Sequence, residues 1–159
     1  MAPALPGAQD RPVGRIVVGL DGSASAKEAL RWAADEAERR GDVVEVVYVW
    51  DNPYRDMWLP KLRTEDPLAH FRVALDTTVS SVLGERPPGG ERPPVEVTTE
   101  VVEGHVAQVL VDRARGADML VVGSRGHGGL AGAFLGSVSF SCAAHAPCPV
   151  VVVRGGVPR

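Results

Sequence analysis

A glycine-rich segment near the C-terminal end of the chain has the residue types and spacing of a loop that can bind phosphate. Between residues 123 and 136 it holds six glycines, namely Gly123, Gly126, Gly128, Gly129, Gly132 and Gly136. An apolar, β-prone run precedes the segment, and Ser137 opens a stretch with helical character after it. Backbone N–H groups in such a strand–loop–helix connection can hold a phosphate, and a helix N-terminus favours an anion by roughly 0.3–1 kcal/mol.

Asp21 is a second candidate, because it follows directly on another apolar run, residues 15–20, in the turn Asp21-Gly22-Ser23. If both apolar runs are parallel strands, Asp21 and the glycine loop lie at carboxyl ends, where open α/β sheets bind their ligands. The two segments are therefore predicted to face one site. The alternative is that Asp21 only caps the helix that follows it.

The chain carries none of the familiar signatures of a nucleotide-hydrolysing or nucleophilic enzyme. The loop lacks the G-K-[ST] ending of a P-loop and does not follow G-x-G-x-x-G. Ser124, in V-G-S-R-G, has no evident triad partners, and neither an acid–base pair nor a kinase signature stands out. Whether the protein is an enzyme stays open: slow turnover is the most that these residues favour, and no catalytic residue is assigned.

The order of predicted elements is that of an α/β fold. Apolar runs at 15–20, 43–50, 95–102, 118–122 and 150–153 predict five strands, and the segments between them predict four helices. Strands that alternate with helices require crossover connections, hence a parallel sheet with helices on both faces. Ser23 or Ser25 is expected to cap the first helix, with Ser25 and Glu28 as a capping box, and Ser137 is a candidate cap for the last.

Composition places the chain among ordinary single-domain globular proteins. Its 159 residues are 45% hydrophobic and 23% charged, and its net charge of −3 argues against a nucleic-acid partner. No run approaches the ~20 apolar residues of a membrane span and no signal peptide is evident, so a cytoplasmic location is expected. Cys142 and Cys148 fit neither a redox nor a zinc pattern; they are interpreted as buried thiols, with a disulfide or redox switch as the alternative.

The domain is expected to occupy residues 14–154, with residues 1–13 as a disordered lead-in and residues 155–159 as a tail. Proline- and glycine-broken segments at about 51–65 and 84–94 are predicted to be mobile loops. The run 95–102 alternates apolar and polar residues, which is typical of a strand with one exposed face, as at a sheet edge.

Together these motifs resemble the universal stress protein family, in particular its ATP-binding branch. That branch carries G-x2-G-x9-G-[ST], matched here by Gly123, Gly126, Gly136 and Ser137. The segment I-V-V-G-L-D-G-S, which contains Asp21, and the ending P-C-P-V-V-V-V-R are also similar to the family. The resemblance covers about residues 14–154. It implies a single open five-stranded Rossmann-like sheet, of the adenine-nucleotide alpha hydrolase-like kind, in strand order 3-2-1-4-5.

The resemblance implies a phosphate side of the site. The phosphates would lie on Gly126, Gly136 and Ser137, with the N–H of Val138 beside them. Asp21 would lie near the ribose and phosphates and help to hold a divalent metal, Mg or Mn.

On the adenine side, the resemblance implies that the base lies between the ends of the second and fourth strands, at Val49, Val122 and Gly123. Gly19 stands where ATP-binding members of the family often have proline, so this wall departs from the family pattern. Arg125 is a further candidate, for which phosphate contact and plain solvation remain equally open.

The function that follows from the resemblance is that of an ATP-binding regulatory module in a stress response, with little or no turnover. A weak ATPase or autophosphorylating enzyme is one alternative, and a sensor of AMP or cyclic AMP at the same site is another. The apolar last strand, Val150 to Val153, would lie at a sheet edge and is predicted to pair with a second copy in a homodimer. A protein partner is expected but not identified, and neither nucleic acid nor membrane is expected as a partner.

Overall fold

A computed structural model describes residues 12–53, 66, 68–84, 94–126 and 135–155 of the chain. Nine elements alternate along it. They are β1 (Arg15–Gly19), α1 (Ala24–Arg40), β2 (Val43–Trp50), α2 (Ala69–Gly84), β3 (Val97–Glu103), α3 (Val106–Arg113), β4 (Met119–Gly123), α4 (Ser137–His145) and β5 (Val150–Val153). All strand pairs are parallel and the order is β3-β2-β1-β4-β5, which confirms the predicted fold class and strand order.

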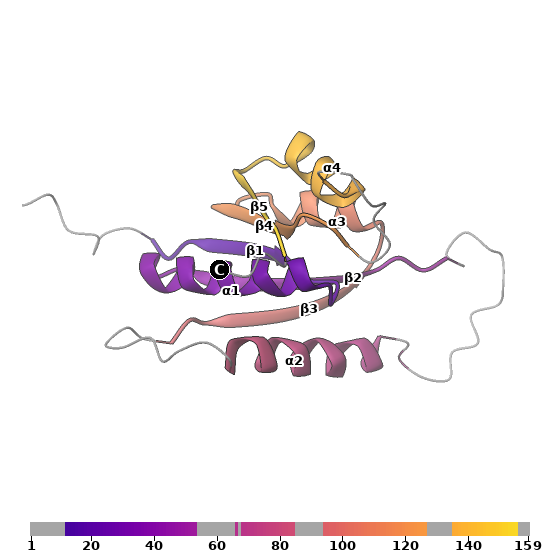
Figure 1. The fold of residues 1–159 in the computed structure, drawn as a ribbon, viewed down its shortest axis with the longest axis horizontal. Coiled ribbons are helices and arrows are strands. Elements are labelled where there is room, and N and C mark those ends of the chain that lie inside the picture. Colours follow the sequence, from indigo (N-terminus) through magenta and orange to yellow (C-terminus); the bar gives the residue numbers. More distant parts are fainter. Residues whose placement is uncertain (1–11, 54–65, 67, 85–93, 127–134, 156–159) are drawn as a thin grey trace, which may run out of the picture.

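The sheet lies between two layers of helices (Figure 1). Helices α1 and α2 cover one face, where alanines of α1 pack against Ile16 and Val18 of β1. Helices α3 and α4 cover the other face, where Leu110 and Cys142 pack against Val17 of the same strand. Because β1 is buried on both faces, its run of apolar residues shows no alternation, as expected for a central parallel strand.

The first turn of α1 confirms one predicted cap and contradicts the predicted capping box. Ser23 is the N-cap, and its hydroxyl accepts the N–H of Ala26. The expected capping box of Ser25 and Glu28 is wrong, since Glu28 pairs instead with Arg31 on the exposed side of the helix. The buried Ser25 side chain is thereby left for another contact, which is described with the site.

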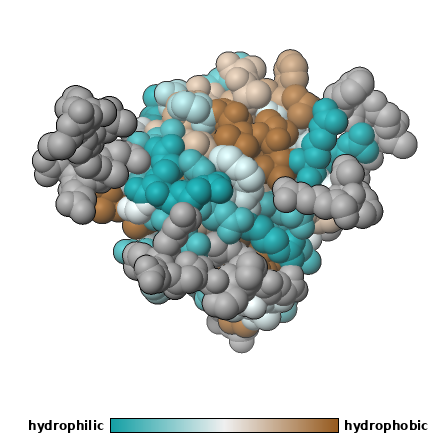
Figure 2. All heavy atoms as spheres, turned by 60° about the vertical axis from the view of Figure 1, so that its left-hand side comes forward, coloured by the Kyte–Doolittle hydropathy of each residue, from teal (hydrophilic) through white to brown (hydrophobic). Residues whose placement is uncertain are grey.

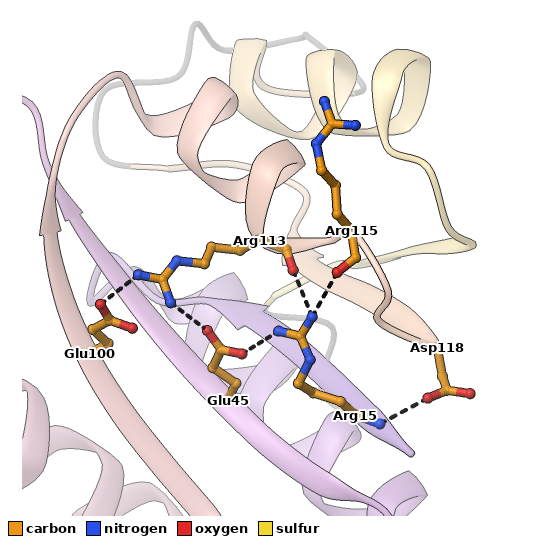
Figure 3. Close-up of polar contacts among 6 residues, drawn as sticks. All are labelled: Arg15, Glu45, Glu100, Arg113, Arg115 and Asp118. Atoms are coloured by element: carbon orange, nitrogen blue, oxygen red, sulfur yellow. Dashed lines mark hydrogen bonds and ion pairs between the residues drawn. The ribbon is translucent and has the colours of Figure 1, made fainter.

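The amino ends of the strands are joined by an ion-pair network, the polar network (Figure 3). Its centre is Glu45 on β2, which pairs with Arg15 of β1 and with Arg113 of α3. Arg113 also binds Glu100 on β3, and these two carboxylates raise the pKa of its guanidinium. Arg15 in addition donates to the carbonyl oxygens of Arg113 and Arg115. The network therefore links three strands and a helix at the edge of the sheet opposite the glycine loop.

Several predictions made from the sequence fall outside the described residues. These concern most of the lead-in, the tail after Gly155, most of the two loops, and Gly128, Gly129 and Gly132 within the glycine segment. Gly155 itself lies against the start of α1, since a Cβ on it would be 2.6 Å from the backbone nitrogen of Ser25. No helix in the described parts of the chain is long and apolar enough to cross a bilayer.

Candidate functional site

One pocket opens at the carboxyl ends of β1, β2 and β4, with a volume of about 380 Å³. Small-molecule sites span roughly 300–1,000 Å³, so the pocket has room for a ligand of nucleotide size at its open end. All ten residues predicted as site residues line it: Gly19, Asp21, Val49, Val122, Gly123, Arg125, Gly126, Gly136, Ser137 and Val138. The fold thus brings two segments about a hundred residues apart to one place; the binding roles of these residues stay predictions.

The deep side of the pocket is apolar. Val49 and Val122, from β2 and β4, lie there together with Val106 and Leu110 of α3. Gly19 makes room for α3, because a Cβ at this position would be 2.8 Å from Cδ1 of Leu110. At this point, where the resemblance leads one to expect proline, the Leu110 side chain occupies the space beside the glycine.

The two residues from α3 were not among the predicted site residues. Val106 and Leu110 are four positions apart and so lie on one face of a helix. Their spacing indicates one apolar helix face, but it does not show that this face of α3 lines a pocket.

The polar side of the pocket is built around the exposed carboxylate of Asp21. Its Oδ1 accepts hydrogen bonds from the N–H of Ser23, at 2.9 Å, and from the Ser23 hydroxyl, at 2.5 Å. Asp21 is thus held by the first turn of α1 rather than capping that helix itself. A Cβ on Gly126 would be 2.8 Å from Oδ2 of Asp21, so glycine lets the loop come close to the carboxylate.

The N-terminus of α4 forms the far wall of the pocket. Gly136 is the N-cap, and Ser137, predicted as a candidate cap, is the first residue of the helix. The backbone N–H of Phe140 donates to the carbonyl of Gly136, which leaves the N–H groups of Ser137, Val138 and Ser139 in the first turn, without acceptors inside the helix. Ser137 is exposed beside them. An anion placed here would meet both these donors and the positive end of the helix dipole.

Three serines of the pocket region were assigned no site role from the sequence beyond possible helix capping: Ser23, Ser25 and Ser139. Ser23 and Ser139 line the pocket, and all three are buried. A serine near a helix start is normally interpreted as a cap, and no pattern in the sequence distinguishes a cap from a contact to a distant loop. Only the packing of α1 against the end of β4 reveals the second role.

The arrangement offers an apolar wall beside an anion cradle and one carboxylate. Among the described residues no group of three or more His, Cys, Asp or Glu side chains is placed to hold a metal ion. A divalent cation at Asp21 would therefore take its other ligands from the bound anion and from water, as Mg²⁺ commonly does at phosphates. The donor set fits a metal that arrives with a phosphate ligand.

Comparison with sequence families gives one match over nearly the whole domain. The model of the universal stress protein family matches residues 12–154. A universal stress protein of Mycobacterium tuberculosis is 36% identical over 152 residues, a region that covers 94% of this chain and 47% of that protein. The chain therefore spans about half the length of the curated relatives it matches.

Solved structures show the same fold. The universal stress protein UspA of Lactobacillus plantarum superimposes with a TM-score of 0.69 at 22% identity, over 91% of this chain and 100% of that one. The universal stress protein of Archaeoglobus fulgidus in complex with dAMP superimposes with a TM-score of 0.63 at 27% identity, over 88% of this chain and 97% of that one.

Proposed function

Because the chain belongs to the universal stress protein family, we propose that it binds an adenine nucleotide, ATP first of all, in the pocket between Asp21 and the glycine loop. The observation that carries the proposal is the division of this one pocket into an apolar wall and an anion cradle. A nucleotide has the same division, with a flat base at one end and phosphates at the other. The Archaeoglobus relative, which was solved with dAMP, supports an adenine nucleotide as the class of ligand.

In this proposal the base lies at the ends of β2 and β4, against Val49, Val122 and Gly123. The phosphates lie on the other side, where Gly126, Gly136 and the first turn of α4 present backbone N–H groups. The exposed Arg125 lines the pocket between the two halves, where its guanidinium can reach a phosphate.

Asp21 is proposed to hold Mg²⁺ or Mn²⁺ together with the phosphates. A carboxylate so close to Gly126 would repel a bare phosphate placed on the loop. A divalent cation between the two reverses this interaction and neutralises phosphate charge. Asp21 itself is kept in position by its two hydrogen bonds from Ser23.

We further propose that the bound nucleotide acts as a regulatory signal in a stress response and not as fuel. The sequence offers no dedicated base, and Asp21, whose carboxylate lies beside Gly126, is assigned to the metal. The signal would be passed to a protein partner in the cytoplasm. A weak ATPase or an autophosphorylating enzyme is the competing function, and Ser137, exposed at the cradle, is its candidate acceptor.

A homodimer through β5 is part of the proposal. The strand is an edge of the sheet, and all four of its valines are half-buried in the single chain. Figure 2 shows hydrophobic surface in the upper half of one face of the molecule. A bare apolar edge strand favours pairing with a second strand. The match covers 47% of a relative, so about half of that longer chain lies outside the region similar to this one.

The proposal is tested by thermal unfolding with and without ligand. A ligand at 100 times its Kd stabilises the folded state by about 2.7 kcal/mol, which raises Tm by roughly 5–10 °C for a domain of this size. We expect this shift with Mg-ATP, and a comparison with AMP and cyclic AMP ranks the alternative ligands. No shift with any of the three would contradict nucleotide binding.

Matched variants locate the site and separate the two functions. Gly126→Val fills the space beside the Asp21 carboxylate and should abolish the shift, whereas Gly84→Val, at a position with open space around it, should keep it. Asp21→Asn should reduce the difference in ATP affinity between Mg²⁺ and EDTA buffers. Release of phosphate from ATP that is lost in Asp21→Asn would favour the enzyme over the regulatory module.

A further inference from the structure

Two buried hydroxyl groups hold the two ends of the glycine loop. Ser25, in the first turn of α1, is 6% exposed, and Ser139, in the first turn of α4, is 2% exposed. Neither residue belongs to the expected set of phosphate-binding residues. Their contacts go to the backbone of the loop, at the points where it leaves β4 and where it enters α4.

Ser25 binds the peptide groups of Arg125, a hundred residues further along the chain. Its hydroxyl donates to the carbonyl oxygen of Arg125 at 2.5 Å, and the N–H of Arg125 points back to the same hydroxyl at 3.4 Å. The position is tightly enclosed, since a Cβ on Gly123 would be 2.5 Å from the Ser25 hydroxyl. Gly123 thus leaves the space that the Ser25 hydroxyl occupies, and the hydroxyl holds the loop where it leaves β4.

Ser139 performs the equivalent task at the other end. Its hydroxyl lies 3.1 Å from the carbonyl oxygen of Ser124 and 3.0 Å from that of Gly136. The N–H of Gly136 donates to the same Ser124 carbonyl at 2.7 Å, so the two ends of the loop are joined to each other. Ser124 in turn donates its N–H to Val153, at the end of β5, at 2.7 Å.

We propose that Ser25 and Ser139 are positioning residues that set the affinity for the phosphate part of the nucleotide by holding the two ends of the glycine loop, at Arg125 and at Gly136, in place. Neither hydroxyl needs to touch the ligand. A loop whose ends are already fixed loses less conformational freedom on binding, and this preorganisation increases affinity. The inference rests on the proposed nucleotide binding and adds two residues to it.

The experiment compares Ser25→Ala and Ser139→Ala with Val82→Ala. Val82→Ala removes buried apolar volume from α2, which does not contact the ends of the loop. It therefore reproduces the loss of stability expected of the serine variants without changing a contact to the loop. Kd values for Mg-ATP and for adenosine are measured by competition at a temperature where all variants are folded. Hydrogen exchange of the Gly136 amide is followed in the ligand-free proteins.

We expect each serine variant to bind Mg-ATP about tenfold more weakly, the fold-change that corresponds to one lost hydrogen bond of ~1.4 kcal/mol. Adenosine affinity should change less than twofold, because adenosine has no phosphate, and Gly136 should exchange faster at least in Ser139→Ala. Val82→Ala should match the wild type in all three measurements.

Two results would overturn the positioning role. One is an equal loss of affinity for ATP and adenosine, or the same loss in Val82→Ala, since a general loosening of the fold would produce it. The other is unchanged ATP affinity together with unchanged exchange at Gly136. Failure of the proposed function looks different, because the wild type would then bind neither ligand, and the exchange measurement would still decide whether the hydroxyls hold the loop.

Discussion

At the scale of single residues, the site depends on glycines, which have no side chain, as much as on residues whose side chains can bind. Gly123 lies where the end of β4 meets the start of α1, and a Cβ there would be 2.7 Å from the backbone nitrogen of Ala26. Gly126 lets the loop approach Asp21, and Gly19 lets Leu110 reach the pocket wall. At Gly123 a larger side chain would push two backbone segments apart, whereas at Gly19 and Gly126 it would displace the ends of the Leu110 and Asp21 side chains.

Gly123→Ala should destabilise the fold, because the clash is with backbone atoms that cannot rotate away. Overpacking of this kind costs about 1–3 kcal/mol, which lowers Tm by roughly 2–10 °C. The same substitution at Gly84, where no atom lies within 4 Å of the added Cβ, should leave the free energy of unfolding unchanged or raise it by up to ~1 kcal/mol. Urea unfolding of both variants measures the difference, and equal stabilities would refute the close packing at Gly123.

The buried thiol of Cys142 makes stability depend on alkaline pH. Burial raises its pKa from 9.0 to about 11 in the folded protein. Below pH 9 the thiol is protonated in both states and its contribution is complete. Between pH 9 and 11 only the unfolded thiol ionises, so the free energy of unfolding falls with rising pH, by at most about 3 kcal/mol.

Cys142→Ala removes this titration. It should be less stable than the wild type at pH 7, by about 1 kcal/mol for the lost packing, and this deficit should shrink by pH 10.5. Urea unfolding at pH 7, 9 and 10.5 measures the trend. Cys148→Ala is measured beside it as a comparison that should change in the same direction, since burial also raises the pKa of the half-buried Cys148 thiol. A constant deficit across these pH values would show that Cys142 does not titrate as inferred.

At the scale of the elements, the carboxyl ends and the amino ends of the strands serve different purposes. The carboxyl ends of the strands carry short polar turns and glycines, and they open into the pocket. The amino ends carry the polar network around Glu45. The Glu45 side chain is only 13% exposed, so it is largely shielded from solvent. Long charged side chains at the amino ends link the strands to one another, while the carboxyl ends leave space for a ligand.

Glu45→Gln should therefore destabilise the fold without affecting nucleotide binding. The change leaves Arg15 and Arg113 without their shared carboxylate, and breaking a pair that is largely shielded from water should cost about 1–3 kcal/mol. Glu28→Gln, which breaks an exposed pair with Arg31 on α1, should cost less than 1 kcal/mol. Unfolding free energies and Mg-ATP affinity are measured for both; a loss of affinity in Glu45→Gln would contradict the separation of the two ends of the strands.

At the scale of the whole molecule, a backbone hydrogen bond connects the pocket region to the predicted dimer strand, since the N–H of Ser124 donates to the carbonyl of Val153. Ser124 N–H and Leu120 N–H donate to the carbonyls of Val153 and Pro149, on the β4 side of β5. Since backbone groups alternate along a strand, Val150 and Val152 direct their N–H and C=O outward, where no described strand pairs with them. These groups are the ones available to a second copy of the chain.

Val152→Pro should convert a dimer to a monomer, because proline removes an outward N–H while the bonds to β4 remain. Light scattering at micromolar concentrations gives the mass, and circular dichroism verifies that the variant is folded. Val73→Lys, at a residue of α2 that is 68% exposed and remote from β5, is the control that should stay dimeric. A wild-type protein that is monomeric at all these concentrations would refute the dimer.

The sequence by itself determined the order of elements and the parallel sheet, and it predicted that Asp21 and the glycine segment lie at one pocket. These follow from local features: β-branched runs, a glycine spacing, and an aspartate directly after a strand. Because parallel strands bring their carboxyl ends to one end of the sheet, the sequence predicts that Asp21 and Gly126 lie close together.

Only the tertiary structure decided which small polar residues serve the site and how the pocket is closed. Ser25 was interpreted as half of a capping box, yet it binds the backbone of Arg125, because α1 packs against the end of β4. Leu110 reached the pocket because Gly19 leaves it space. Contacts of this kind join residues about a hundred positions apart through packing, and packing depends on the relative placement of whole elements, which no local pattern in the chain records.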